Sequence, residues 1–282
     1  MENTLSMETS RPRLSARLLA NPLVQIIIGI LFTFAPVPLT MIIASKLVDK
    51  AYRVVWPQLL AAIFVWISYH FYVRRIQKRA VTELTLPQAP RELGLGLLLG
   101  GAMVTAVFAV LAVFGVYRVD GINGFRLMLL LPLAELLLVA LTEEALFRGV
   151  LFGVTEQALG SKAAIVISAL VFGLAHMPNE GITALSVAGI FAYGVLQAAI
   201  YIKTRRLWVC IGSHIAWNYC AGQVFSGTVS GHADAAGLMR GQLGGAPWLT
   251  GGAFGVEGSL ITLLVLGVAS VVFLRLAFKR PA

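Results

Sequence analysis

Three ionisable side chains, Glu143, Glu144 and Arg148, interrupt the apolar run LLLVALTEEALFRGVLF at residues 136–152. Charged groups inside a membrane-type segment cost free energy, so they normally face a bundle interior or a water-filled cavity. Glu144 and Arg148 stand four residues apart and share a helix face, a spacing that suits an ion pair. Glu143 points about 100° away from Glu144, which makes it the freer carboxylate. Such a carboxylate could take a proton from water, although a structural ion pair explains Glu144 and Arg148 equally well.

Two of the four histidines follow in later apolar segments. His176 ends the run FGLAH before Pro178, and Phe172 lies four residues earlier on the same helix face. His214 and Asn218 are also four residues apart, in GSHIAWN, so an imidazole and a carboxamide project together. This pair could hold a water molecule or donate to an oxyanion. Taken singly, His176 also suits an interfacial position, and His214 with Asn218 suits interhelical hydrogen bonding.

These groups can act together only at similar depths in the membrane. With a rise of 1.5 Å per residue, His214 lies about 12 Å from Arg206, and Glu143 lies about 14 Å from the inner end of its own segment. His176 comes out deeper, about 20 Å from Lys162. The helix rise therefore predicts a deeper position for His176 than for His214 and Glu143.

A metal is an open alternative at these residues. Glu143, His176 and His214 could provide three ligands of a zinc site with an open position. The sequence contains no HExxH and no Gly-x-Ser-x-Gly. We expect either no cofactor or Zn²⁺, with a slight preference for a metal-free site because no short-range pair of histidine ligands is present.

The composition predicts the elements that must carry these residues. Of the 282 residues, 58% are hydrophobic and only 12% are charged, against about 25% charged in average soluble domains. The expected fold is an all-α, polytopic membrane helical bundle with about eight transmembrane helices. The predicted spans are Leu23–Ser45, Gln58–Val73, Leu93–Tyr117, Leu127–Phe152, Ala163–Met177, Ile182–Ile202, Leu207–Phe225 and Ser259–Phe278.

Lysine and arginine cluster in alternate connections between these spans, as the positive-inside rule requires when both termini are cytoplasmic. Short basic clusters between apolar runs also argue against nucleic-acid binding, despite the net charge of +9. The expected partners are the lipid bilayer and a membrane-associated peptide or protein. Cys210 and Cys220 lie about 15 Å apart along one helix, too far for a disulfide.

We expect the chain to be divided by its spans. A cytoplasmic N-terminal tail (1–22) precedes N-terminal transmembrane helices (23–125) and a core that carries the candidate site residues (126–226). A Gly-rich loop (227–258) then leads to a C-terminal transmembrane helix (259–282).

Three motifs, in this order and within apolar segments, resemble those of one known family. They are Glu143-Glu144-Ala-Leu-Phe-Arg148, Phe172-Gly-Leu-Ala-His176 and His214-Ile-Ala-Trp-Asn218, and the stretch at 204–208 before the third also fits. The family is that of the CAAX-prenyl-protease and bacteriocin-processing (CPBP) membrane proteins, also called the Abi or type II CAAX endopeptidase (Rce1-like) family. The resemblance covers residues 130–222, and the Gly-rich GGAFGVEGS resembles bacterial members.

The resemblance implies an intramembrane endopeptidase that opens toward the cytoplasm, in a bacterial inner (plasma) membrane. By analogy, Glu143 and His176 would activate water, His214 and Asn218 would support the oxyanion, and Arg148 would orient Glu143 and Glu144. Family members include metal-dependent proteases and metal-independent glutamate proteases, so the resemblance leaves zinc open. The substrate would be a membrane-associated peptide, with a prenylated CAAX type as one option.

Two other functions fit the same residues. A non-catalytic membrane scaffold or bacteriocin-immunity-type protein would keep the fold and would still work without Glu143. A proton-coupled transporter would use the buried carboxylates as a relay. A transporter would more often show inverted repeats with broken helices in paired positions, and the sequence shows no such symmetry.

Overall fold

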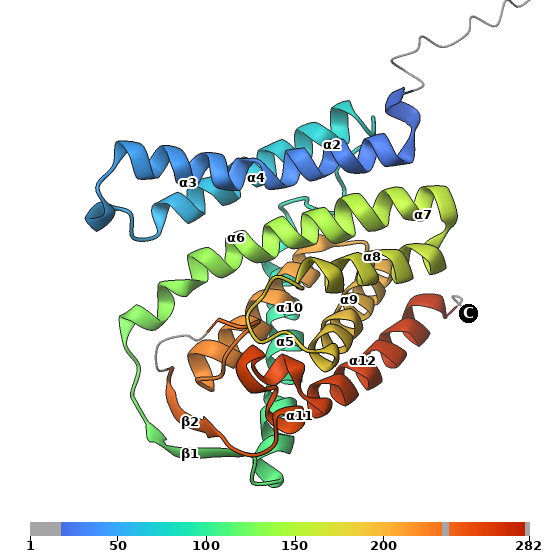
Figure 1. Ribbon diagram of the computed structural model, residues 1–282. Helices are drawn as coiled ribbons and strands as arrows, with labels where there is room; N and C mark the ends of the chain where they lie inside the picture. Colours follow the sequence, from blue (N-terminus) through green and yellow to red (C-terminus); the bar gives the residue numbers. More distant parts are fainter. Residues whose placement is uncertain (1–17, 233–236, 280–282) are drawn as a thin grey trace, which may run out of the picture.

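The computed structural model describes residues 18–232 and 237–279, which form a helical bundle of the membrane type. The predicted fold class is thereby confirmed, with one two-stranded sheet added at the edge of the bundle. Figure 1 shows the N-terminal helices as a layer over a long helix, with the remaining helices packed beneath.

The covering layer consists of α2 (Pro22–Phe34), α3 (Pro36–Leu47) and α4 (Trp56–Arg75). The amide side chain of Asn21 caps the start of α2 by accepting from the backbone of residues 23 and 24. Pro36 begins α3, where its missing N–H costs no hydrogen bond. The predicted first span therefore holds two helices joined at Ala35, and the short 3₁₀ turn η1 (Lys50–Tyr52) leads on to α4.

The long helix below this layer carries both adjacent glutamates. A 3₁₀ turn, η2 (Leu127–Leu130), precedes α6 (Pro132–Glu144), which continues without interruption into the π-helix η3 (Ala145–Phe152) and α7 (Gly153–Leu159). The π-helix is the feature that the sequence did not predict. Such segments are rare and often occur at functional sites.

Glycines bring α5 (Ala89–Val113) and α10 (Leu207–Tyr219) into close contact. A Cβ on Gly96 or Gly100 would overlap backbone atoms of α10, and one on Gly212 would overlap the backbone of α5. Small residues at membrane helix crossings allow this kind of backbone approach. The helix α10, which carries His214 and Asn218, is thus fixed against α5.

The remaining helices complete the bundle around α10. They are α8 (Ser161–Ala175), α9 (Ala184–Thr204), the π-helical end of α10 called η4 (Cys220–Val224), and α12 (Leu260–Phe278). Both α8 and α12 pack on α9. Cys210 and Cys220 are both free thiols.

Two predicted connections have structure of their own. The third span stops at Val113, and Tyr117 instead begins strand β1 (Tyr117–Ile122), which pairs antiparallel with β2 (Met239–Leu243). The Gly-rich connection after η4 therefore contains a strand, followed by the short helices α11 (Pro247–Thr250), η5 (Gly252–Phe254) and η6 (Val256–Gly258). Buried Phe254 and Val256 pack this connection into the core.

The exposed surface of the helices is apolar, as an integral membrane protein requires. Leu23, Leu31 and Phe34 on α2 are more than half exposed, and so are Leu264 and Val268 on α12. In the described residues, four helical stretches are long and apolar enough to cross a bilayer: Pro22–Leu47, Ala89–Val113, Ala184–Thr204 and Leu260–Phe278. The predicted number of about eight spans stays a prediction.

Candidate active site

The centre of the site is a buried ion pair between Glu144, at the end of α6, and Arg148, in the π-helix. Arg148 Nη1 lies 3.2 Å from Glu144 Oε1, and both side chains are almost completely shielded from solvent. The guanidinium also lies 4.7 Å from the ring centre of Phe172, so a cation–π contact adds to the charge pairing. The i,i+4 spacing had predicted this pairing from the sequence.

Two further donors reach the same carboxylate oxygen. His214 Nδ1 lies 3.0 Å from Glu144 Oε1, and Gln197 Nε2 donates to it at 3.2 Å. An ionised carboxylate can only accept hydrogen bonds, so three donors on one oxygen favour the charged form of Glu144. The carboxylate holds His214 with Nδ1 toward Glu144, which turns Nε2 away from it.

Glu143 occupies the half-open position beside His214. Its side chain is 26% exposed, and its Oε2 lies 3.9 Å from His214 Nε2. This distance is too long for a hydrogen bond, and Oε2 is buried without a hydrogen-bond partner among the described residues. Oε2 of the fully buried Glu144 has no partner either, so the two carboxylates differ in another way: Oε1 of Glu144 is committed to Arg148 and His214, whereas Glu143 is partly exposed and has no arginine partner.

His176 enters the site from the end of α8. It is the C-cap residue of this helix, and its Nδ1 lies 2.8 Å from the backbone oxygen of Phe172. A carbonyl oxygen can only accept, so the Nδ1 of His176 carries a hydrogen and the Nε2 of the neutral ring is left as an acceptor. The ring also packs on the Phe172 ring, with 4.6 Å between centroids.

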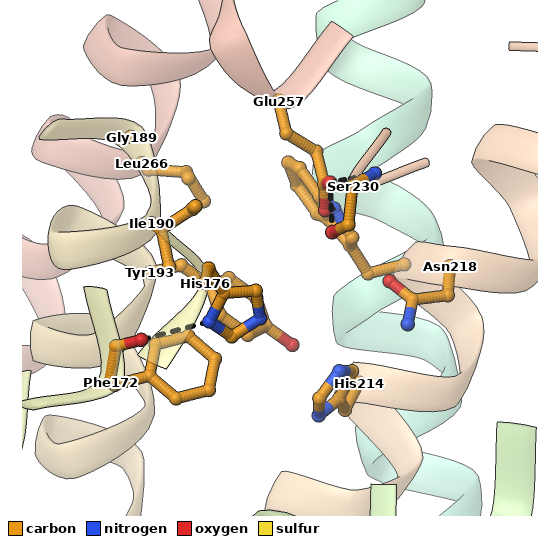
Figure 2. A pocket seen from close by; sticks show the side chains of 11 residues that line it. Phe172, His176, Gly189, Ile190, Tyr193, His214, Asn218, Ser230, Glu257 and Leu266 are labelled. Atoms are coloured by element: carbon orange, nitrogen blue, oxygen red, sulfur yellow. Dashed lines mark hydrogen bonds between the residues drawn. The ribbon is translucent and has the colours of Figure 1, made fainter. Parts of the chain in front are cut away.

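The two histidines and Asn218 line one pocket, in which His176 faces His214 and Asn218 from the opposite wall (Figure 2). The cavity volume is about 20 Å³, which exceeds the roughly 10–15 Å³ that one water molecule needs. Glu143 and Glu144 do not line this pocket themselves and reach it through His214. The helix-rise calculation had placed His176 deeper than His214, yet both reach the same cavity because His176 caps the end of the short helix α8.

Several polar residues of the site lie outside the three sequence motifs. Gln197 and Tyr193 come from α9, and Gln197 also donates to the Tyr193 hydroxyl and to the backbone oxygen of Cys210. Ser230 and Glu257, from the Gly-rich connection, line the pocket opposite His176. A glutamine in an apolar span, and one acidic residue in the otherwise uncharged stretch 241–258, were the available signals in the sequence.

A zinc site does not fit the side chains as they are arranged. Within residues 18–232 and 237–279, no group of three His, Cys, Asp or Glu side chains is placed to hold a metal ion. Both histidines use Nδ1 in a hydrogen bond and leave Nε2 free, which is the usual orientation of a zinc-ligating histidine, so the misfit lies in the placement of Glu143 on the His214 side of the site.

Residues 125–220 match the family model described as type II CAAX prenyl endopeptidase Rce1-like. Residues 125–220 are similar to this family and are called the Rce1-like domain. The resemblance seen in the three motifs is thus confirmed by an independent comparison. The Rce1-like domain runs from the turn before α6 to the start of η4 and includes all six candidate residues: Glu143, Glu144, Arg148, His176, His214 and Asn218.

The Rce1-like family is one of membrane proteases of the CAAX type, which supports the same class for this chain. The matched range ends before Ser230 and Glu257, so the wall of the pocket that these two residues form comes from outside the Rce1-like domain. A comparison with curated proteins gave no match to this chain.

Proposed function

We propose that the chain is an intramembrane endopeptidase that hydrolyses a peptide bond in a membrane-associated substrate. One observation carries the proposal. His214 is hydrogen-bonded to a buried, Arg-paired carboxylate and lines the same water-sized pocket as His176 and Asn218. An imidazole held in this way by a carboxylate has a defined tautomer and orientation, which acid–base catalysis requires.

Glu143 and His176 are the groups proposed to activate water. The unpartnered Oε2 of Glu143 and the free Nε2 of His176 are both acceptors, so either atom could accept the proton that water loses when it attacks. Water oxygen attacks the carbonyl carbon while its proton passes to Glu143. The tetrahedral intermediate then breaks its C–N bond as this proton is delivered to the leaving nitrogen, which yields a carboxylic acid and an amine, and the acid then loses its proton to the amine.

Asn218 and His214 are proposed to support the oxyanion. The carboxamide of Asn218 provides N–H donors, and protonated His214 would donate from Nε2. Removing one such donor typically costs about 10²–10³ in rate. Arg148 acts indirectly. It forms an ion pair with Glu144 and so holds in place the carboxylate that orients His214.

The metal-dependent alternative stays a separate hypothesis. If zinc were bound, Glu143, His176 and His214 would be its ligands and it would polarise the attacked carbonyl. This would require side chains to rearrange from the geometry described above.

The membrane orientation is proposed from the connections between helices. Three connections predicted to be cytoplasmic meet at one end of the bundle: Arg206 binds Glu92, Arg205 binds Glu156, and the backbone N–H of Leu207 donates to Glu83. The turn after His176 meets the Gly-rich connection at another place, through Asn179 and Ser230. Both termini would then be cytoplasmic, in a bacterial inner membrane. The predicted tail (1–22) lies mainly outside the described residues.

Each predicted segment of the chain is proposed to have its own role. Residues 126–226 form the catalytic core, 23–125 and 259–282 flank it as transmembrane helices, and 227–258 close the pocket. The substrate is proposed to be a lipidated peptide of the CAAX type. The proposal for substrate rests on the family description and on the location of the site in the membrane.

The test is hydrolysis of a farnesylated CAAX peptide by the full chain in proteoliposomes. Glu143→Gln and His176→Ala should each abolish hydrolysis, whereas Glu135→Gln, an exposed glutamate on the same helix α6, should cleave normally. Normal cleavage by both site variants would refute the proposal. Biological rescue by Glu143→Gln would support a scaffold or immunity-type protein, and proton-coupled flux would support a transporter.

A further inference from the structure

Glu257, in η6 just before α12, accepts three hydrogen bonds at one wall of the pocket. Its Oε1 accepts from Trp217 Nε1 at 2.8 Å, and its Oε2 accepts from the backbone N–H and hydroxyl of Ser230 at 2.7 and 2.6 Å. In the described part of the chain, no cation forms an ion pair with this carboxylate. A half-buried carboxylate without a cation, held by three donors, fixes the positions of those donors.

One of these donors belongs to the His214 side of the pocket. Trp217 directly precedes Asn218 and is almost fully buried. Its ring lies 5.7 Å from the Tyr193 ring, which in turn lies 5.6 Å from the His214 ring. The bond from Trp217 to Glu257 therefore fixes the face of α10 that presents His214 and Asn218.

The other donor leads to the His176 side. The backbone oxygen of Ser230 accepts from Asn179 Nδ2 at 3.0 Å, and the backbone N–H of Asn179 donates to the His176 oxygen at 3.0 Å. Glu257 is thus connected to both histidines: through Trp217 to α10, and through Ser230 and Asn179 to the end of α8. Figure 2 shows Glu257 and Ser230 together on the wall beyond Asn218.

The connection that carries these residues is held by close backbone contacts. Gly231, with a φ of +84°, donates to the backbone oxygen of Phe254 at 2.8 Å. A Cβ on Gly255, with a φ of +100°, would overlap the backbone oxygen of Thr228. Both positions need glycine because of their φ and their close approach. Residues 228–231 and 254–257 therefore form one packed unit.

The helices that carry the two histidines pack mainly on other helices and not on each other. The helix α8 packs mainly on α9, and α10 packs mainly on α5 and α6. No hydrogen bond between described residues joins His176 directly to His214. The route through Glu257 is a hydrogen-bonded connection between the two walls on the side of the Gly-rich connection, whereas Arg148 and Tyr193 join them from the other side through Phe172.

We propose that Glu257 is a positioning residue that sets the separation between His176 and His214 across the pocket. Its effect on rate rests on the proposed function, because the two histidines matter for turnover only if they act on one substrate. A displacement of about 1 Å in a reacting group can lower a rate by about 10²-fold. Because Glu257 lies in the Gly-rich connection, this connection has a role in the reaction although it lies outside the Rce1-like domain.

The experiment compares Glu257→Gln, Asn179→Asp and their double variant in the full chain in proteoliposomes, well below each variant's unfolding temperature. Glutamine at 257 presents an NH₂ group where Ser230 needs an acceptor, and aspartate at 179 removes the donor to Ser230. Glu156→Gln is the matched control, since this glutamate pairs with Arg205 away from the pocket. Each single site variant should lower kcat about 10²-fold with KM within about twofold, and the double variant should be no slower than Glu257→Gln.

A second readout does not depend on catalysis. The imidazole ¹⁵N resonances of both His176 and His214, assigned with alanine variants, should move in Glu257→Gln and stay in place in Glu156→Gln. Unmoved resonances in Glu257→Gln would overturn the positioning role, as would unchanged kcat or additive losses in the double variant. If the wild type cleaves no peptide, the proposed function fails while the resonances still decide whether Glu257 couples the two histidines.

Discussion

Nδ1 of His214 lies 3.0 Å from Oε1 of Glu144, a carboxylate with no exposed surface that also pairs with Arg148. This contact joins the first and third sequence motifs across two helices that are separated by about seventy residues. It gives Glu144 a structural and orienting role and leaves Glu143 as the partly exposed carboxylate without an arginine partner.

Glu144→Gln should destabilise the protein more than Glu143→Gln. Removing one partner of a buried ion pair leaves an uncompensated charge, here Arg148, at a cost of about 3–5 kcal/mol. Glu143 is 26% exposed and has no such partner. In detergent, the thermal unfolding temperature should fall by a large amount for Glu144→Gln and change little for Glu143→Gln. Equal falls would contradict the division of roles.

Combining Glu144→Gln with Arg148→Met should recover part of that stability without recovering hydrolysis. The double variant leaves no unpaired buried charge, so its loss should be smaller than the sum of the two single losses. His214 would still lack its carboxylate partner, so activity should stay low. A double-mutant cycle on unfolding midpoints measures the coupling, and additive losses would argue against the ion pair.

Gln197→Leu should lower both stability and hydrolysis, although the residue lies outside the motifs. It would remove one of the three donors to Glu144 and the side-chain donor to the backbone oxygen of Cys210, in a fully buried environment. Such a loss costs about 1–3 kcal/mol. Unfolding and turnover should be measured on the same preparations. Wild-type behaviour in both would show that the bond from Gln197 does not hold Glu144.

Gly100→Ala should disturb the site from outside it. A Cβ at this position would overlap the backbone oxygen of Ser213, the neighbour of His214, and overpacking of this kind costs about 1–3 kcal/mol. The control is Gly101→Ala, because a Cβ on Gly101 meets no atom within 4 Å. Only the first substitution should lower the unfolding temperature and turnover.

The stability of the fold should decrease as the pH falls, because Glu83, in the connection between α4 and α5, becomes protonated. Burial alone would raise the pKa of Glu83, but hydrogen bonds and charge from Arg79, with a hydrogen bond from Tyr69, lower it below its ordinary value. A carboxyl with a lowered pKa stabilises the fold above its unfolded pKa of about 4.3 and loses this effect as the pH falls through its folded pKa.

The measurement is the difference in unfolding midpoint between wild type and Glu83→Gln. The difference should be largest near about pH 7 and should shrink below about pH 4. Glu156→Gln should behave similarly, since the pKa of Glu156, which burial alone would raise, is lowered by its bonds to Arg205 and Ser161. A difference in unfolding midpoint that grew as the pH fell would contradict this prediction.

The sequence predicted the parts of the site that depend on helical spacing. The pairing of Glu144 with Arg148 followed from their i,i+4 separation, and the three motifs led to the family that the Rce1-like match then confirmed. The helical membrane-type bundle followed from composition. These features are local or compositional, so periodicity and hydropathy are enough to reveal them.

The remaining parts depend on contacts between distant segments. Glu257 and Trp217 are forty residues apart, and the pairing of β1 with β2 joins segments on either side of the Rce1-like domain. Gln197 looked like one polar residue in an apolar span, and no local pattern showed that it would meet Glu144. The π-helix after Glu144 was also missed, because the sequence there reads as an ordinary amphipathic helix.

That π-helix makes the protein sensitive to chain length as well as to residue type. Residues Ala145–Phe152 form i→i+5 hydrogen bonds in place of the i→i+4 bonds of an α-helix, so the segment accommodates an extra residue. Deleting one residue there would let the segment return to α winding while the flanking helices keep their places, and the wide turn that carries Arg148 would be lost. Arg148 would then face other neighbours. Over evolution, we expect this segment to exchange side chains while insertions and deletions are eliminated.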